Sequence, residues 1–262
     1  CHSASDLTIL SMMCSAKVAL PCVGGAVLGT SRRRGASCQG RCRGEDRNVI
    51  ALERGRYRAR LADGPLDLDA VLALRGRVFR GGLAPDGDGF DALCSHLMIE
   101  EVSGGLVGTG RMMVLTGAEV EAGYAAQFYD LGPLTAWPGR MLELGRFALD
   151  PGWHDPDILR LAWAALARVV TEREVELLFG CTSFKGAAPE AHLNALALLA
   201  ERHVGPPRWR PVPKAEVFPF AEVLAGHPVA TETALAEMPT LLRSYLQLGG
   251  WVSDHAVADP DL

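Results

Sequence analysis

The sequence has few aromatic side chains and no excess of positive charge. Phe, Trp and Tyr make up 6% of its 262 residues, and the formal net charge is -5 with a pI near 5.8. Proteins that bind nucleic acid carry a basic surface, and those that bind single strands add aromatic platforms on which bases stack. The composition therefore argues against nucleic-acid binding. It favours an enzyme that acts on a small molecule or on a protein partner.

Disulfide and metal-binding patterns are also missing. Five of the seven cysteines lie within the first 42 residues, and the single C-x3-C, "CQGRC", has no nearby histidine. Cys94 and Cys181 are expected to be buried thiols of a reducing compartment, which predicts a cytoplasmic protein. His96, His154 and His192 show no ligand spacing. We expect no metal and no bound cofactor.

The first 54 residues lack a sustained helical or alternating pattern. Residues 8–30 are apolar, but Lys17 and Pro21 interrupt them, and the arginines at 32–34 follow the run instead of preceding it. This order disfavours a signal peptide or membrane anchor. We expect a poorly ordered or non-native extension, whose arginines leave open a peripheral contact with an anionic inner membrane.

From residue 55 onward, strands and helices are expected to alternate. The expected strands are 56–62, a hairpin over 96–115 around "SGG", 141–150 and 175–184. The expected helices are 67–81, 156–174, 189–203 and 232–250, the last broken at Pro239. Residues 116–140 are irregular and could shape a substrate site, and 208–220 are extended but broken by prolines. The pattern predicts one α/β (α+β) domain over 55–262 with a mixed sheet flanked by helices.

The strand "MLELGRFALD" carries two charged residues where burial is expected. Glu143 and Arg146 are three residues apart, so in a regular strand they would point to opposite faces. Gly145 lies between them, and glycine inside a strand often marks a bulge. One extra residue there would bring both side chains to one face and free backbone N–H groups for a ligand. A buried ion pair between Glu143 and Arg146 is the alternative.

Further charged residues could join this pair. Arg75 lies on the first expected helix, Asp88 and Asp91 lie in the glycine-rich "DGDGFD", and Arg111 interrupts an apolar strand. Aspartate in such a loop is also ordinary turn chemistry. The run "GGLVGTG" lies inside a hairpin, so it is a poor match to a nucleotide-binding loop.

Several motifs in order resemble the ornithine N-acyltransferases of ornithine-lipid synthesis, a GNAT family related to the acyl-homoserine-lactone synthases. They are "LRGRVF", "DGFDALCSHLMI", "GGLVGTGRMM", "GYAAQFYDL", "LELGRFALDP" and "LLFGCTSFKG", with "PTLLRSYLQLGGWVSDHAVADPDL" at the end. The resemblance covers about residue 55 to the end. It implies a GNAT-like fold with a bulged, splayed strand at 141–150, and a domain that continues beyond Leu262. Gly76 and Ser95 depart from the family pattern, as does the short stretch before "DGDGFD".

The resemblance implies transfer of a (3-hydroxy)acyl chain from an acyl-carrier-protein thioester to the α-amine of ornithine. The family's pattern of site residues falls on Arg75, Phe79, Asp88, Asp91, Arg111, Glu143 and Arg146. Glu143 is expected to act as general base, with Arg146 as its catalytic partner. Backbone N–H groups of Gly145, Arg146 and Phe147 could hold the thioester carbonyl.

The charges of ornithine leave two assignments open. Its carboxylate suits Arg111 or Arg146, and its side-chain ammonium suits Asp88 or Asp91.

The expected start of the helix 156–174 bears on the donor. Asp155 and Asp157 stand where related enzymes place glycines around a coenzyme A pyrophosphate, and they would repel it. This favours a phosphopantetheine-linked carrier protein over acetyl-CoA. A homoserine-lactone synthase and a non-catalytic carrier-binding domain are the two alternative functions.

Overall fold

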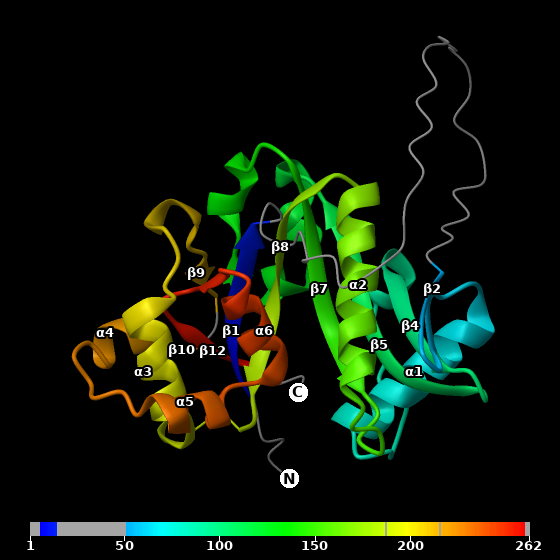
Figure 1. Ribbon diagram of the computed structural model, residues 1–262. Coiled ribbons are helices and arrows are strands. Elements are labelled where there is room, and N and C mark those ends of the chain that lie inside the picture. Colours follow the sequence, from blue (N-terminus) through cyan, green and yellow to red (C-terminus); the bar gives the residue numbers. More distant parts are fainter. Residues whose placement is uncertain (1–5, 15–50, 187, 215, 260–262) are drawn as a thin grey trace, which may run out of the picture.

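A single mixed sheet runs through the protein, with helices on both of its faces (Figure 1). The computed structural model describes residues 6–14, 51–186, 188–214 and 216–259. The strand order is β10-β12-β1-β8-β7-β5-β4-β3-β2, and β11 pairs with β1. The β7–β8 pair is parallel, and the other described pairs of this sheet are antiparallel.

The strands are β1 (Asp6–Cys14), β2 (Leu52–Arg54), β3 (Tyr57–Leu61), β4 (Ser95–Glu101), β5 (Gly105–Leu115), β7 (Arg140–Leu149), β8 (Val175–Phe184), β10 (Val217–Phe218), β11 (Trp251–Val252) and β12 (Ala256–Asp259). The helices are α1 (Pro65–Phe79), α2 (Pro156–Glu172), α3 (Leu193–Arg202), α4 (Phe220–Val223), α5 (Thr231–Glu237) and α6 (Thr240–Gln247). A separate two-stranded sheet joins β6 (Tyr129–Asp130) to β9 (Val212–Pro213).

The strands and helices expected from residue 55 onward are confirmed, including the break at Pro239 between α5 and α6. The hairpin β4–β5 turns at Gly104, whose φ of 110° favours glycine. α2 begins at Pro156, and the Asp155 side chain accepts a hydrogen bond from the backbone N–H of Asp157 at 3.0 Å.

The N-terminal boundary at residue 55 needs correction. β1 pairs antiparallel with β8 along eight residues, from Leu7 opposite Phe184 to Cys14 opposite Leu177, and it also pairs with β11 and β12. β2 extends the other edge of the sheet. Residues 6–14 and 52–54 therefore belong to the folded domain, whereas 15–50 lie outside the described residues. Residues 6–14 do not alternate in polarity, so the strand is recognised only from its pairing with β8, β11 and β12.

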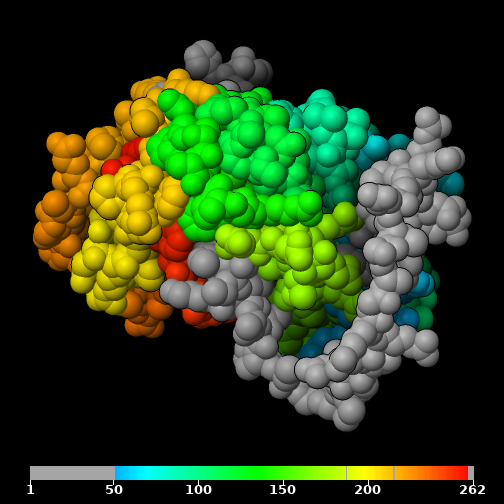
Figure 2. Space-filling model, turned by 90° about the horizontal axis from the view of Figure 1, so that it is seen from above, coloured from blue at the N-terminus to red at the C-terminus, as the bar shows by residue number. Residues whose placement is uncertain are grey.

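Two layers cover the sheet. α2 packs on one face, where Trp163 meets Tyr245 of α6 edge to face at 5.3 Å between ring centroids. α3, α4 and α5 pack over the β8–β12 end around Leu196 and Phe220. On the opposite face lie α1 and three short 3₁₀ helices, Gly117–Ala122, Tyr124–Gln127 and Gly132–Ala136. Figure 2 shows the green residues of this segment at the surface, between the teal and yellow parts of the chain.

No described helix is long and apolar enough to cross a membrane.

Candidate active site

β7 contains the predicted bulge. Thr109 pairs with Ala148 and Arg111 pairs with Gly145, so Gly110 faces two residues of β7 instead of one. The left-handed residue is Arg146, with φ 47°, and not the glycine beside it. This conformation is uncommon for a non-glycine residue and often marks a functional position.

The bulge brings Glu143 and Arg146 to the same face of the sheet, as predicted. Both contact Tyr124: its backbone N–H donates to Glu143, and its ring lies 5.2 Å from the Arg146 guanidinium carbon. Phe147 points to the other face, where its ring packs beside Gly110 in the core under α2. Any role of Phe147 at the site is therefore limited to its backbone.

β7 and β8 separate beside the bulge, which confirms the expected splay. Their described parallel pairing ends at Glu143 and Phe179, while β8 continues beside β1 to Phe184. The strands still approach closely where they part, because a Cβ added to Gly180 would lie 2.1 Å from the Leu144 carbonyl oxygen. The bulge thus lies where the two central strands begin to diverge.

The Glu143 carboxylate is bound by backbone N–H groups and does not form an ion pair with Arg146. Oε2 accepts from Tyr124 at 2.8 Å and Oε1 accepts from Ala125 at 2.7 Å. Glu143 is 5% exposed, and this burial raises its pKa although the two N–H groups and the charge of Arg111 oppose the shift. The predicted alternative of a Glu143–Arg146 ion pair is therefore wrong. A carboxyl group with a raised pKa suits proton transfer near neutral pH.

Arginines and aspartates from three elements meet beside this carboxylate. Arg75 of α1 contacts Asp86 at 2.9 Å and Asp91 at 2.5 Å. Arg111 of β5 contacts Asp88 at 2.5 Å and Asp91 at 3.1 Å. Burial would raise the pKa of Asp91, but hydrogen bonds from Arg75, Arg111 and the backbone of Asp88 lower it overall. The sequence predicted these residues except Asp86, and the structure brings them together.

Asp86 is central to the network, although its sequence context does not distinguish it from a turn residue. Its carboxylate is 2% exposed and contacts three arginines: Arg75 at 2.9 Å, Arg80 at 3.0 Å and Arg146 at 3.4 Å. The only local signal was a third aspartate in "PDGDGFD", which also fits a turn. Asp86 is buried because the chain after α1 folds back, with its backbone N–H donating to the Leu72 carbonyl.

Four polar atoms of this cluster make no hydrogen bond with the described residues. They are Arg75 Nη2, Arg111 Nη2, Arg146 Nε and Asp88 Oδ2. Arg75 Nη2 nevertheless lies 2.9 Å from the Asp86 carboxylate. The nearest ionic contacts of Arg146 are long, at 3.4 Å to Asp86 and 3.9 Å to Asp88. Buried polar atoms are normally paired, so the cluster has unused binding capacity for both charge signs.

Aromatic rings pack against both of these arginines. The Tyr124 centroid lies 5.2 Å from the guanidinium carbon of Arg111 and of Arg146. Phe79, expected at the site, lies 5.9 Å from Arg146, and Phe90 lies 5.6 Å from Arg111. Aromatic faces attract cations, so the rings help to fix the guanidinium planes. Tyr124 and Phe90 lie within motifs of the family resemblance but were not proposed as site residues.

A small cavity of about 10 Å³ lies against Glu143. Arg111, Gly145, Cys94 and Met113 are among its lining residues. A Cβ added to Gly145 would meet nothing within 4 Å, so Gly145 leaves open space at the bulge. Burial raises the pKa of the Cys94 thiol to about 11, which disfavours a nucleophilic thiolate at neutral pH.

α2 follows β7 in the chain, and two aspartates stand at its N-terminal end. Asp155 caps the helix and accepts from Tyr57 Oη at 3.0 Å, while Asp157 pairs with Arg54 and Arg160. No group of three potential metal ligands occurs among the described His, Cys, Asp and Glu residues.

Comparison with known proteins identifies the family. A GNAT acetyltransferase domain family matches residues 75–164. The L-ornithine N(alpha)-acyltransferase of Rhodobacter capsulatus is 34% identical over 221 residues, which cover 78% of this chain and 85% of that protein. The chain belongs to the L-ornithine N(alpha)-acyltransferase family. A second member, from Rhizobium meliloti, is 30% identical over 76% of this chain and 74% of that protein.

In this member of the L-ornithine N(alpha)-acyltransferase family, the charged cluster spans Arg75 to Arg146. The whole cluster lies within the residues that match the GNAT domain. The predicted family, the GNAT fold and the acyltransferase activity are confirmed. Among solved structures, an N-acyl amino acid synthase from uncultured soil microbes is similar with a TM-score of 0.37 and 17% identity, over 47% of this chain and 69% of that chain.

Proposed function

We propose that the protein transfers a (3-hydroxy)acyl chain from acyl-carrier protein to the α-amine of ornithine. This would be the first step of ornithine-lipid synthesis and would give lyso-ornithine lipid. The observation that carries the proposal is a buried carboxylate with a raised pKa, beside cationic and anionic atoms of one cluster that make no hydrogen bond. An amino acid with a second ammonium group needs both charge signs. The names of the curated relatives supply ornithine as the acceptor.

Each charged group of ornithine is assigned to a side chain that still has an atom without a hydrogen bond. Both Asp91 oxygens already accept hydrogen bonds, Oδ1 from Arg75 and Oδ2 from the backbone N–H of Asp88. Asp88 Oδ2 accepts no hydrogen bond and the side chain is 25% exposed, so Asp88 is assigned to the side-chain ammonium. Arg146 and Arg111 each have a nitrogen that makes no hydrogen bond, and they are assigned to the α-carboxylate. Arg75 is not assigned to it, because its own Nη2 lies 2.9 Å from Asp86.

The chemical step is an aminolysis of the thioester. Glu143 takes a proton from the α-ammonium, directly or through water, and the amine nitrogen attacks the thioester carbonyl carbon. The new C–N bond forms, the C–S bond breaks, and the thiol of the carrier leaves with a proton. Arg146 and Phe147 stand opposite a single residue of β5, and their backbone N–H groups, with that of Gly145, are assigned to the developing oxyanion.

The carrier-protein donor is supported by the start of α2. Asp155 already accepts the backbone N–H of Asp157, and both carboxylates would repel a pyrophosphate. A phosphopantetheine arm presented by a carrier protein avoids this repulsion. Tight binding of acetyl-CoA in calorimetry would contradict this assignment. Cytoplasmic placement and contact with anionic membrane lipid remain predictions.

The test uses the full chain, because β1 is part of the sheet. Purified protein is incubated with 3-hydroxyacyl-carrier protein and ornithine, lysine or S-adenosylmethionine, and products are identified by mass spectrometry. We expect an ornithine-dependent amide that is lost in Glu143→Gln and retained in Glu53→Gln, a substitution of an exposed glutamate on β2. A lactone product would instead establish a homoserine-lactone synthase. Carrier binding without any product, unaffected by Glu143→Gln, would establish a non-catalytic domain.

A further inference from the structure

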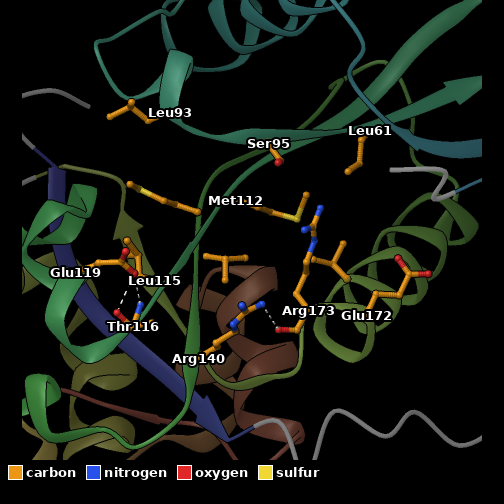
Figure 3. Close-up of a pocket in the computed structure, with 13 residues that line it drawn as sticks. Leu61, Leu93, Ser95, Met112, Leu115, Thr116, Glu119, Arg140, Glu172 and Arg173 are labelled. Carbon is orange, nitrogen blue, oxygen red and sulfur yellow. Dashed lines mark hydrogen bonds between the residues drawn. The ribbon is translucent and has the colours of Figure 1, made fainter. Parts of the chain in front are cut away.

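A groove lies beside the C-terminal end of β5, beyond the part of β5 that pairs with β4 (Figure 3). β4 starts at Ser95 opposite Met112, so the last three residues of β5, Met113 to Leu115, extend beyond it. The groove has a volume of about 420 Å³, within the range of small-molecule sites. Leu61, Val169 and Leu93 contribute apolar walls.

Two of the four charged side chains that line the groove interact with its own walls, and a third, Glu172, pairs with Arg168. Glu119 accepts hydrogen bonds from the backbone and side chain of Thr116, and Arg140 donates to the Arg173 carbonyl (Figure 3). Two large apolar side chains remain exposed beside them: Leu93 at 66% and Val114 at 38%. The lining is therefore mixed, with exposed apolar side chains beside charged ones, and the apolar side chains offer contacts to an apolar ligand.

Met113 connects this groove to the candidate active site. It is the only residue that lines both the groove and the small cavity beside Glu143 and Gly145 in the described part of the chain. Its Cα pairs with Glu143 across the β5–β7 ladder. The cavity, at about 10 Å³, is at the lower limit for one water molecule. A substrate therefore requires a side chain to move, and the half-buried, unbranched Met113 is suited to this.

We propose that this groove binds the acyl chain of donor and product, and that Met113 separates it from the reacting carbonyl. The inference rests on the proposed acyl transfer. The acceptor's charges belong on the other side of Met113, where Asp88 Oδ2 and Arg146 Nε make no hydrogen bond, whereas Glu119 and Arg140 of the groove already bind its own walls. A straight chain gains affinity at each methylene group it buries, by about fourfold.

The test compares donors of different chain length on one carrier protein. We measure kcat/KM with butanoyl- and hexadecanoyl-carrier protein and ornithine, and we take the ratio of long to short. Leu93→Glu places a charge in the groove and is expected to lower this ratio at least tenfold while short-chain turnover is kept. Leu66→Glu is the matched control, since Leu66 is 83% exposed at the start of α1, and it should leave the ratio unchanged.

A second variant addresses the connection itself. Met113→Ile introduces a stiff, branched side chain and is expected to lower the same ratio, whereas Met113→Ala is expected to keep or raise it. An unchanged ratio in both Leu93→Glu and Met113→Ile would overturn the inference and leave the proposed function standing. Equal loss with both donors in Leu93→Glu would also overturn it, because the groove would then contact the carrier protein. No turnover of either donor by the unsubstituted protein would overturn the proposed function and the inference with it.

Discussion

The backbone N–H of Tyr124 donates to Glu143 at 2.8 Å, so the irregular segment after β5 is bound to the central strand through the candidate base. Gly123 permits this approach, because a Cβ there would lie 2.6 Å from Glu143 Oε2. The same Tyr124 presents its ring to Arg111 and Arg146. The carboxylate that is assigned to proton transfer therefore also positions the aromatic ring that orders the two arginines.

Glu143→Gln is expected to lower kcat by about 10²- to 10⁴-fold, the usual contribution of a general base. Because burial raises the pKa of Glu143, the base becomes unprotonated only above the ordinary glutamate range. The acidic limb of kcat/KM should therefore lie at a higher pH than an exposed glutamate would give. A pH profile from pH 4 to 9 checks this, and a limb below pH 4.5 would contradict it.

Asp88→Asn is expected to raise KM for ornithine by roughly tenfold to a hundredfold, as for loss of a charged hydrogen bond. Norvaline has the same carbon chain as ornithine without the side-chain ammonium. Its KM should be almost unchanged by the substitution, because it makes no contact with this carboxylate. Initial rates with both acceptors test the assignment. An equal rise for both would show that Asp88 acts only by holding Arg111.

Asp86→Ala is expected to destabilise the fold by about 3–5 kcal/mol, because it leaves buried Arg75 and Arg146 without their shared counter-charge. Chemical denaturation monitored by tryptophan fluorescence gives the free energy of unfolding. Asp69→Ala removes an exposed aspartate of α1 and should change that free energy by less than about 0.5 kcal/mol. A loss below 1 kcal/mol at Asp86 would show that the network contributes little to stability.

Gly180→Ala is expected to lower the melting temperature, since its Cβ would meet the Leu144 carbonyl at 2.1 Å where β7 and β8 part. Such overpacking costs about 1–3 kcal/mol. Gly145→Ala is the matched comparison: its Cβ meets nothing within 4 Å, so stability should hold while turnover falls because the methyl group occupies the site. Thermal unfolding and activity of both variants separate the two effects.

The sequence was sufficient for the features that depend on local pattern. Period-two and helical spacing located the strands and helices after residue 55, and a glycine between two charged residues indicated the bulge in β7. Motif order identified the family, and most of the charged residues that it pointed to do meet at one site. These features are encoded by near neighbours in the chain, or by several motifs that recur together.

Only the tertiary structure decided what depends on residues distant in sequence. Asp6–Cys14 becomes a strand because β8 and the C-terminal strands pair with it, and nothing in its own pattern requires that. The bulge takes the left-handed conformation at Arg146, because register with β5 determines which residue is extra. Asp86 is buried among three arginines since the loop after α1 folds over β7. The partners of Glu143 are backbone N–H groups of Tyr124 and Ala125, which side-chain patterns do not reveal.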